Sequence, residues 1–368
     1  MKKTILLNGP AIYDKGGLYP AGTGGMARNM KILLEQFQSE HFNMKPVFNS
    51  VRKSKSPGAV SFVLRMVRDS FNMFRRTPGA HGAHIFGTYR TATVREFFAV
   101  LICRLFRVPV LYQIRAGYFI NWYKGSGKIQ RQMIHWILRH AEVVICEGRP
   151  YVDFLEELGF KAYHFPNFAP SAEIPAEVGE KLQDPVIRLV YVGYCWDQKG
   201  VFELVEGCRL AAEKDIPIAL TLVGNEAPDF TAWLDEIGDQ PFEFNRLGVQ
   251  SHDKVLEGYG TNDVFCMPSK FFGEGHNNAI NEAMMMGMVI ISSKQGFLES
   301  VLGEENAWFL DEVTPEQIAL ALEDIHNNRE EARARAKGAR NRVLTRYNSN
   351  IAFSQLEKHY LELTGREN

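Results

Sequence analysis

Short apolar runs alternate with longer amphipathic segments along the chain, and this pattern occurs twice in its 368 residues. Short apolar runs are typical of buried strands, whereas apolar positions three and four apart are typical of helices. In the first half we predict strands at residues 4–8, 44–48, 84–86, 109–114, 142–146 and 162–165. In the second half we predict them at residues 187–193, 219–224, 242–245, 263–267 and 289–292. This alternation predicts an α/β protein with doubly wound parallel sheets.

The segment between the two halves, residues 167–175 and on to 185, is rich in proline and weakly periodic. We therefore predict a Rossmann-like N-terminal domain (1–168), a linker (169–185), a second Rossmann-like domain (186–345) and a C-terminal helix (346–368) that packs back on the first domain. Ligands of such sheets bind at the carboxyl ends of the strands. The expected active site is a cleft between the two domains.

Composition narrows the class of protein. Apolar residues make up 45% and charged residues 23%, as in ordinary globular proteins. Five cysteines without a Cys-x-x-Cys pair disfavour a disulfide framework or a zinc site and fit a reducing cytoplasm. The apolar run at residues 4–7 ends at Asn8-Gly9-Pro10, so it is interpreted as a buried strand and not as a signal peptide. The longest apolar stretch, residues 97–106, is too short to span a bilayer.

The charge is divided unevenly. Residues 1–168 hold 24 Lys and Arg against 10 Asp and Glu, a balance of +14, and the rest holds 18 against 33, a balance of −15. Such asymmetry suggests that the first half meets an anionic membrane surface, a phosphorylated acceptor or a nucleic acid. The plain alternative is that these residues only solvate the surface. No recognised nucleic-acid module occurs, which disfavours a nucleic-acid partner.

A basic amphipathic helix is predicted from residue 60 to residue 76. Its apolar positions are Val60, Val63, Leu64, Val67, Phe71 and Phe74, and its other side carries Arg65, Arg68, Asn72, Arg75 and Arg76. One interpretation is a surface helix whose apolar face is docked on the sheet. The other is contact with an anionic membrane through the arginines. Both hold together if the basic face points outward.

The strongest chemical signal is the stretch 268–283. Glu274 lies in a loop after a strand, and Glu282 lies about two turns into a helix that opens near Asn277. Amides at a helix start hold phosphate or sugar oxygens, helped by the helix dipole. Carboxylates accept hydrogen bonds from sugar and ribose hydroxyls. Taken alone, two glutamates eight residues apart more often mean a solvated helix face.

Two further turns combine glycine with a helix start. Gly193 and Lys199 fall in the turn 192–200, which suits a diphosphate but also occurs in plain strand–helix turns. Glycines at residues 16–25 allow a backbone to approach a ligand closely. Ala27 breaks the Gly-x-Gly-x-x-Gly pattern, and no acidic residue follows the second strand, so a nicotinamide cofactor is disfavoured. The P-loop motif does not occur either.

The second half resembles family 4 of the GT-B glycosyltransferases. The resemblance rests on Val192-Gly193, Leu222-Val223-Gly224, Pro268-Ser269, the Glu274/Glu282 pair and Phe297-Leu298-Glu299. The first half matches loosely, through Gly24-Gly25 and Pro166-Asn167. The resemblance implies a GT-B fold and a retaining hexosyltransferase (EC 2.4 class) that uses a nucleotide-sugar as substrate, without a metal or another cofactor. The absence of an Asp-x-Asp motif agrees with the last point.

The resemblance also implies roles for individual residues. Glu274 and Lys199 are the expected catalytic residues. The expected donor-binding residues are Gly24, Gly25, Gly193, Lys199, Gly275, His276, Asn277, Asn278 and Glu282. Tyr194 and Arg115 stand where the family usually has Arg and His, and they are candidates for a sugar or phosphate contact.

The expected reaction moves a sugar from a UDP-sugar, with a GDP-sugar as the alternative, to a saccharide or an undecaprenyl-diphosphate-linked saccharide. The product would be a capsule, O-antigen or lipopolysaccharide, made in the cytoplasm or peripherally at the inner face of the membrane. The alternatives are another GT-B enzyme, such as a sugar phosphorylase or a nucleotide-sugar epimerase, and a degenerate nucleotide-sugar-binding protein.

Overall fold

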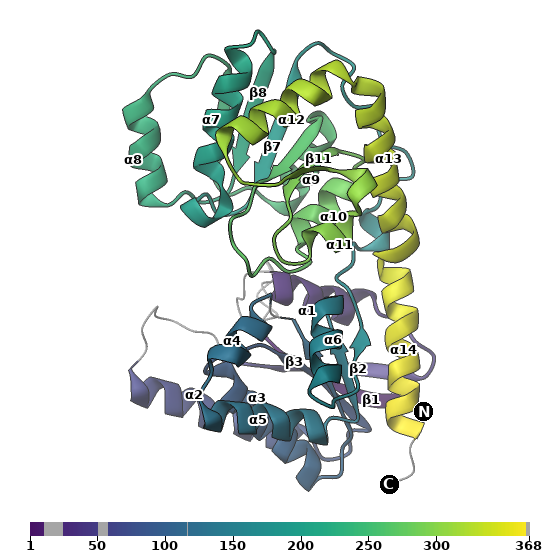
Figure 1. Cartoon of the computed structure of the whole chain (residues 1–368). Coiled ribbons are helices and arrows are strands. Elements are labelled where there is room, and N and C mark those ends of the chain that lie inside the picture. The colour runs from purple at the N-terminus through teal and green to yellow at the C-terminus, as the bar shows by residue number, and fades with distance from the viewer. Residues whose placement is uncertain (11–24, 51–57, 116, 366–368) are drawn as a thin grey trace. The chain divides into compact units, whose positions relative to one another are not determined.

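The computed structural model describes residues 1–10, 25–50, 58–115 and 117–365 (Figure 1). Within it the chain forms two compact units. Unit 1 consists of Met1–Pro166 and Ala352–Asn368, and unit 2 of Asn167–Ile351. The segment 169–185, the expected linker, groups with unit 2.

Unit 1 is built on a six-stranded parallel sheet of order β2-β1-β3-β4-β5-β6. Its strands are β1 (Lys3–Gly9), β2 (Phe42–Phe48), β3 (Gly82–Gly87), β4 (Val110–Ile114), β5 (Val143–Cys146) and β6 (Tyr163–His164). Its helices are α1 (Gly25–Gln36), α2 (Ala59–Arg76), α3 (Ala92–Leu105), α4 (Phe119–Gly125), α5 (Lys128–His140), α6 (Arg149–Glu157) and α14 (Ser349–Gly365). Strand β2 contains Pro46, which its place at the edge of the sheet tolerates.

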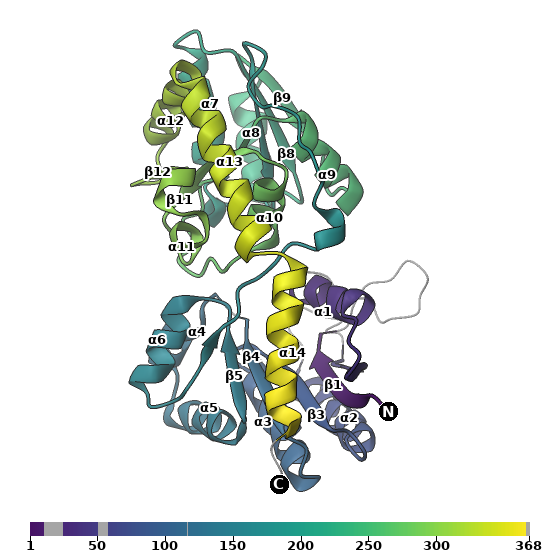
Figure 2. The ribbon, with the colours of Figure 1, turned by 90° about the vertical axis from the view of Figure 1, so that its right-hand side faces the viewer.

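The last helix, α14, is part of the core of unit 1 (Figure 2). The Tyr360 hydroxyl lies 2.6 Å from Nδ1 of His84, and Nε2 of His84 lies 2.9 Å from Oε1 of Gln113. Burial lowers the pKa of His84 to about 3, so its ring is neutral. The ring of Phe37 meets the rings of Phe353 and Tyr360 edge-on, at 5.4 and 6.0 Å. Residues some 300 positions apart in sequence thus share one core.

Unit 2 is built on a second six-stranded parallel sheet, of order β12-β11-β10-β7-β8-β9. Its strands are β7 (Ile187–Val192), β8 (Ile218–Val223), β9 (Glu243–Arg246), β10 (Val264–Met267), β11 (Val289–Ser293) and β12 (Trp308–Leu310). Its helices are η1 (Ser171–Glu173), η2 (Asp197–Lys199), α7 (Val201–Ala212), α8 (Pro228–Ile237), α9 (His252–Thr261), α10 (Asn278–Met285), α11 (Leu298–Leu302), η3 (Glu304–Asn306), α12 (Pro315–Asn327) and α13 (Arg329–Arg346).

The predicted α/β class with two doubly wound parallel sheets is confirmed. Each predicted strand has an observed counterpart whose ends differ by at most two residues. Strand β12 was not predicted, because three residues are too few to show an alternating pattern. The Trp308 indole donates a 2.7 Å hydrogen bond to the Asp324 carboxylate, which ties this strand to α12.

The expected orientation of helix α2 is wrong. The helix packs on unit 1 through the face opposite to its apolar one. The six apolar side chains expected to dock on the sheet are exposed, from 49% for Phe74 to 74% for Val60. The buried side chains of the helix are Asp69 and Met73. The Asp69 carboxylate accepts hydrogen bonds from the amide and the hydroxyl of Ser50, at 2.9 and 2.5 Å. This polar anchor and Met73 fix the inward face.

Candidate functional site

The loop that carries Glu274 runs from the end of β10 to the start of α10. Asn277 is the N-cap of α10, since its side-chain oxygen accepts a 2.9 Å hydrogen bond from the amide of Ile280. The helix therefore begins at Asn278, next to the predicted opening. Its N-terminus, the positive end of the helix dipole, lies beside the loop at the carboxyl end of the sheet.

The Glu274 carboxylate is buried and bonded on both oxygens. Glu274 is 4% exposed. Its Oε1 pairs with the ammonium of Lys199 and accepts a 2.9 Å hydrogen bond from the Ser269 hydroxyl. Its Oε2 accepts a 3.3 Å hydrogen bond from the side-chain amide of Asn277. Burial of a carboxylate is tolerated only with such partners, and these contacts fix the position of Glu274.

The backbone of Glu274 is held as closely as its side chain. Its carbonyl accepts a 3.1 Å hydrogen bond from the amide of Phe297. A Cβ atom on Gly296 would lie 1.8 Å from this carbonyl oxygen, and Gly296 has a φ of +60°. Glycine is therefore required here, both for the close approach and for the left-handed backbone. Sequence reasoning missed Gly296, although it singled out the turn that follows.

Lys199 reaches Glu274 because the β7–α7 loop lies directly against the end of β10. Lys199 ends the short helix η2, and Gly200 follows with a φ of +68°. A Cβ atom on Gly200 would lie 1.9 Å from the carbonyl oxygen of Pro268. Only glycine allows the two loops to meet at this distance.

Lys270 ties the same two loops together. Its amide donates to the carbonyl of Gln198 at 2.9 Å, and its ammonium contacts the carboxylates of Asp197 at 2.6 Å and Glu203 at 2.7 Å. These contacts restrain the backbone on both sides of Lys199. The positions of Lys199 and Glu274 are thus fixed by neighbouring residues as well as by their own ion pair.

The environment of Lys199 makes its charge sensitive to pH. Its side chain is 23% exposed, and burial lowers its pKa to about 8. The neighbouring Glu274 carboxylate favours the ammonium form. The ammonium also lies 5.6 Å from the centre of the Phe271 ring. A partly buried cation beside a helix N-terminus is suited to balancing the charge of a phosphate group.

His276 and Glu282 are both buried in unit 2. Nε2 of His276 lies 2.8 Å from Oδ1 of Asn281, and its ring meets the ring of Tyr347 edge-on at 4.8 Å. The backbone carbonyl of His276 accepts a 2.8 Å hydrogen bond from the side-chain amide of Asn167. His276 is 1% exposed and therefore packs its ring inside unit 2, while Glu282 lies in α10.

Two polar residues of the site were quoted in the sequence motifs without a role. Ser269 bonds Glu274, and Asn167 bonds both the carbonyl of His276 and, at 2.7 Å, Oδ1 of Asn278. Their signal was weak, because a polar residue after a strand or after a proline is common in loops. Only the three-dimensional arrangement brings them to the Glu274 loop.

The turn after β7 contains two more predicted residues. The amide of Gly193 donates to the carbonyl of Val223 at 2.9 Å, next to the end of β8. Tyr194 is 49% exposed, and its carbonyl accepts a 3.1 Å hydrogen bond from the Tyr191 hydroxyl. Gly275 lies in the loop between Glu274 and Asn277.

The remaining predicted residues belong to unit 1. Gly25 begins α1, and Gly24 lies outside the described residues. Arg115 follows β4, and its guanidinium lies 3.6 Å from the carboxylate of Glu147. Burial lowers the pKa of Arg115 and raises that of Glu147, and each partner opposes the shift of the other. Lys199, Glu274 and the residues around them therefore lie together in unit 2. Arg115 belongs to unit 1.

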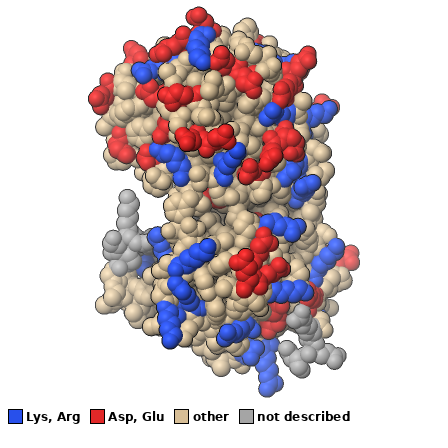
Figure 3. Space-filling view, viewed as in Figure 1, with Lys and Arg blue, Asp and Glu red and all other residues tan. Residues whose placement is uncertain are grey.

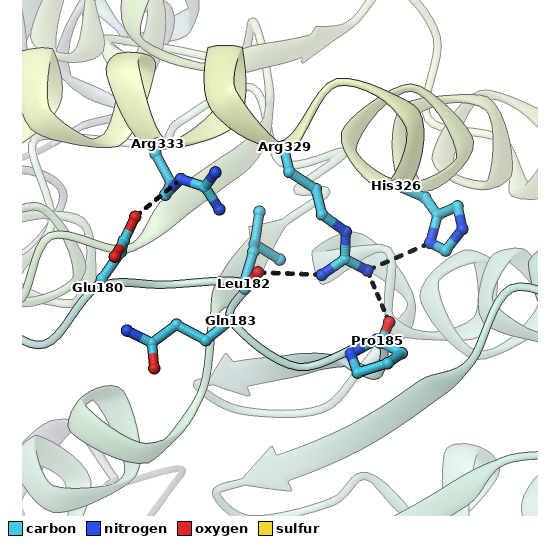
Figure 4. A pocket seen from close by; sticks show the side chains of 7 residues that line it. All are labelled: Glu180, Leu182, Gln183, Pro185, His326, Arg329 and Arg333. Carbon is cyan, nitrogen blue, oxygen red and sulfur yellow. Dashed lines mark hydrogen bonds and ion pairs between the residues drawn. The ribbon is translucent and has the colours of Figure 1, made fainter.

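A separate hollow in unit 2 lies between residues 180–185 and the helices α12 and α13 (Figure 4). Its guanidinium groups are engaged within the protein. Arg329 donates to the carbonyls of Leu182 and Pro185, at 3.1 and 2.6 Å, and Arg333 pairs with Glu180 at 3.1 Å. These contacts hold the segment 180–185 against α12 and α13, which gives the residues around the hollow a structural role.

Two features are absent from the described part of the chain. No group of three or more His, Cys, Asp or Glu side chains there is placed to hold a metal ion. None of the helices there is both long and apolar enough to cross a membrane. A reaction without metal remains a prediction.

Residues 186–328 match the family model described as glycosyl transferases group 1. The match covers most of unit 2. The match contains the Lys199–Glu274 pair, Glu282 and Gly296, and it confirms the resemblance inferred from the sequence motifs.

Two curated relatives carry glycosyltransferase names. The amylovoran biosynthesis glycosyltransferase AmsK of Erwinia amylovora is 25% identical over 193 residues, which is 50% of this chain and 47% of that protein. The capsular polysaccharide biosynthesis glycosyltransferase CapM of Staphylococcus aureus is 22% identical over 186 residues, 49% of this chain and 47% of that protein. The similarity thus spans about half the length of these relatives.

Solved structures resemble the whole chain in fold. Sucrose-phosphate synthase from Thermosynechococcus elongatus has a TM-score of 0.74 at 16% identity, over 99% of this chain and all of that one. HepE of Anabaena, solved in complex with UDP, has a TM-score of 0.67 at 13% identity, over 98% of this chain and all of that one. The chain therefore has the GT-B fold, in unit 1 as well as in unit 2.

Proposed function

We propose that this protein is a retaining glycosyltransferase that moves a sugar from a nucleoside-diphosphate sugar, preferably a UDP-sugar, to a saccharide or an undecaprenyl-diphosphate-linked saccharide. One observation carries the proposal: the Lys199–Glu274 pair is fixed at the carboxyl end of a parallel sheet, beside the N-terminus of α10. A cation and helix amides suit a diphosphate, and a carboxylate suits sugar hydroxyls.

In the proposed reaction the bond between the anomeric carbon and the diphosphate oxygen breaks, and the acceptor oxygen bonds to that carbon on the same face. The acceptor proton passes to the leaving diphosphate. Lys199 and the amides at the start of α10 stabilise the negative charge that develops there, and one such contact typically contributes about 2–4 kcal/mol. Glu274 orients the donor sugar, and Glu282 binds the ribose.

Two lines of similarity support the choice of substrates. The names of AmsK and CapM refer to amylovoran and to capsular polysaccharide, which are surface glycans. HepE has been solved with UDP and with UDP-glucose, which favours uridine over guanosine. The product we propose is a capsule, O-antigen or lipopolysaccharide, made in the cytoplasm or at the inner membrane face, without a metal ion.

The test is a thermal-shift panel of UDP-, GDP- and ADP-sugars and their nucleoside diphosphates, with a chelator present. A ligand at one hundred times its dissociation constant adds about 2.7 kcal/mol of stability. We expect one nucleotide series, that of uridine, to raise the melting temperature, and we expect Glu282→Ala to lose this shift. If no nucleotide shifts the protein with or without acceptor, the degenerate-site alternative replaces this proposal.

Product analysis separates transfer from the other GT-B reactions. A transferase releases nucleoside diphosphate in proportion to acceptor, and the glycosidic product keeps the anomeric configuration of the donor. Formation of a sugar 1-phosphate from a glycoside and inorganic phosphate, without a nucleotide, would indicate a phosphorylase. Conversion of the donor into its epimer would indicate an epimerase.

A further inference from the structure

Helix α2 presents an apolar stripe to solvent. Val60, Val63, Leu64, Val67, Phe71 and Phe74 are each between 49% and 74% exposed. At 100° per residue these six positions fall within an arc of about 100° on one side of the helix. The buried residues Asp69 and Met73 lie on the opposite side. A helix that only covers the sheet would bury such a stripe, and contiguous exposed apolar side chains are typical of interaction surfaces.

The neighbouring helix α3 extends the apolar surface. Helices α2 and α3 pack against each other, and the ring of Phe74 meets that of Phe106, at the end of α3, edge-on at 5.1 Å. Phe98 and Leu105 are 40% and 68% exposed, and a spacing of seven residues places them on one side of α3. Exposed apolar side chains therefore occur on both of these packed helices.

The charge around this surface has one sign. Between residues 58 and 115 the only acidic residues are Asp69 and Glu96, and both are buried. Exposed arginines occur on the same helices and next to them, at positions 68, 75, 76, 104 and 107. Arg68 and Arg75 lie next to each other along one edge of the stripe on the wheel of α2. On the face drawn in Figure 3, Lys and Arg are spread over unit 1, whereas most Asp and Glu lie over unit 2.

We propose that α2 lies in the interfacial layer of an anionic lipid bilayer, with its apolar stripe among the acyl chains and with Arg68 and Arg75 at the headgroup phosphates. An amphipathic helix with an arginine-flanked apolar face binds membranes in this way. A second copy of this chain fits less well, because paired stripes would bring exposed arginines of the two copies together without acidic partners. The inference concerns a surface of unit 1 and does not depend on the proposed transfer reaction.

This arrangement differs from docking through the basic face. Arginines that only touch headgroups release the protein when salt screens them. Inserted Val, Leu and Phe side chains are insensitive to screening. Salt should therefore weaken membrane binding without abolishing it, and replacement of the stripe should remove it at every salt concentration.

The experiment is flotation of the full-length protein with vesicles of phosphatidylethanolamine and phosphatidylglycerol, at low and high salt. We expect the native protein to float at both. Val67→Asp with Phe71→Asp should lower the bound fraction more than tenfold, whereas Leu320→Asp, at an exposed apolar position of α12, should leave it unchanged. Arg68→Gln with Arg75→Gln should weaken binding at low salt by about fivefold per arginine.

The two stripe positions are exposed, so the aspartate variant should fold, and circular dichroism and the nucleotide-induced thermal shift check this. Absence of native flotation, or flotation of the stripe variant equal to that of the native protein, overturns the proposal. A dimer that Val67→Asp dissociates, in a protein that does not float, assigns the stripe to a second copy and also overturns it. Flotation does not require turnover, so failure here and failure of the proposed reaction are distinguishable.

Discussion

The loop around Glu274 in unit 2 and the helix α2 in unit 1 have opposite patterns of burial. The loop buries a carboxylate and gives it three donors, from Lys199, Ser269 and Asn277. The helix exposes a row of apolar side chains and buries Asp69. The first arrangement fixes a few atoms in place, as chemistry requires, and the second offers a continuous surface, as association requires.

The comparison also separates two kinds of sequence signal. The loop signal depends on residue types at fixed spacings, and the family model that matches unit 2 contains it. The helix signal depends on periodicity, which is the same whichever face points inward. A motif can therefore identify a site, while an amphipathic period leaves the orientation of the helix open.

The largest expected effect is the loss of turnover when the carboxylate of Glu274 in unit 2 is removed. We expect Glu274→Ala to abolish measurable turnover, a loss of at least about 10²- to 10³-fold, because the donor sugar loses its acceptor and Lys199 loses its partner. The fold should remain intact. Nucleoside diphosphate release with donor and acceptor measures the rate, and the melting temperature measures the fold.

A matched control removes a carboxylate from an exposed ion pair in the same unit. Glu323 pairs with Lys214, and both side chains are at least 40% exposed. Such a pair contributes at most about 1 kcal/mol, so Glu323→Ala should keep the native rate. If Glu274→Ala also keeps it, Glu274 does not belong to the site, and the contrast between the loop and α2 disappears.

The next prediction tests how closely the two loops of unit 2 approach each other. Gly200→Ala should destabilise the protein, because the new Cβ would lie 1.9 Å from the Pro268 carbonyl and the φ of +68° is unfavourable for alanine. Gly159, which follows α6 as a left-handed cap with a φ of +81°, has nothing within 4 Å of its Cβ position, so Gly159→Ala carries the conformational cost alone, about 1 kcal/mol.

Urea unfolding of the two alanine variants isolates the steric term. We expect Gly200→Ala to lower the free energy of unfolding by about 1–3 kcal/mol more than Gly159→Ala does. Equal losses would mean that the β7–α7 loop does not rest on Pro268. The route by which Lys199 reaches Glu274 would then be wrong.

Much of the fold followed from the sequence, and the reasons are local. The eleven predicted strands were readable because apolar runs between helical segments need no knowledge of their neighbours. Strand β12 escaped because it has three residues. Lys199 and Glu274 were singled out through their motifs, but the roles of Ser269 and Gly296 were not, since both depend on contacts between separate loops. The outward face of α2 also depends on a long-range contact, that between Asp69 and Ser50.

The smallest expected effect concerns the charge of Lys199. Burial holds its pKa at about 8, below the ordinary value of 10.5, so the free protein loses this proton as pH rises through about 8. A bound diphosphate favours the ammonium, so nucleotide binding takes up a proton above that pH. The dissociation constant for the nucleoside diphosphate should therefore rise with pH, by at most about tenfold per unit.

Titration calorimetry between about pH 7 and pH 9.5 measures this slope. Lys199→Arg keeps its charge throughout this range and should give a flat profile, because arginine does not titrate there. An equal slope in the arginine variant would assign the proton to another group and would remove Lys199 from the phosphate contact, while the ion pair with Glu274 would remain as a structural feature.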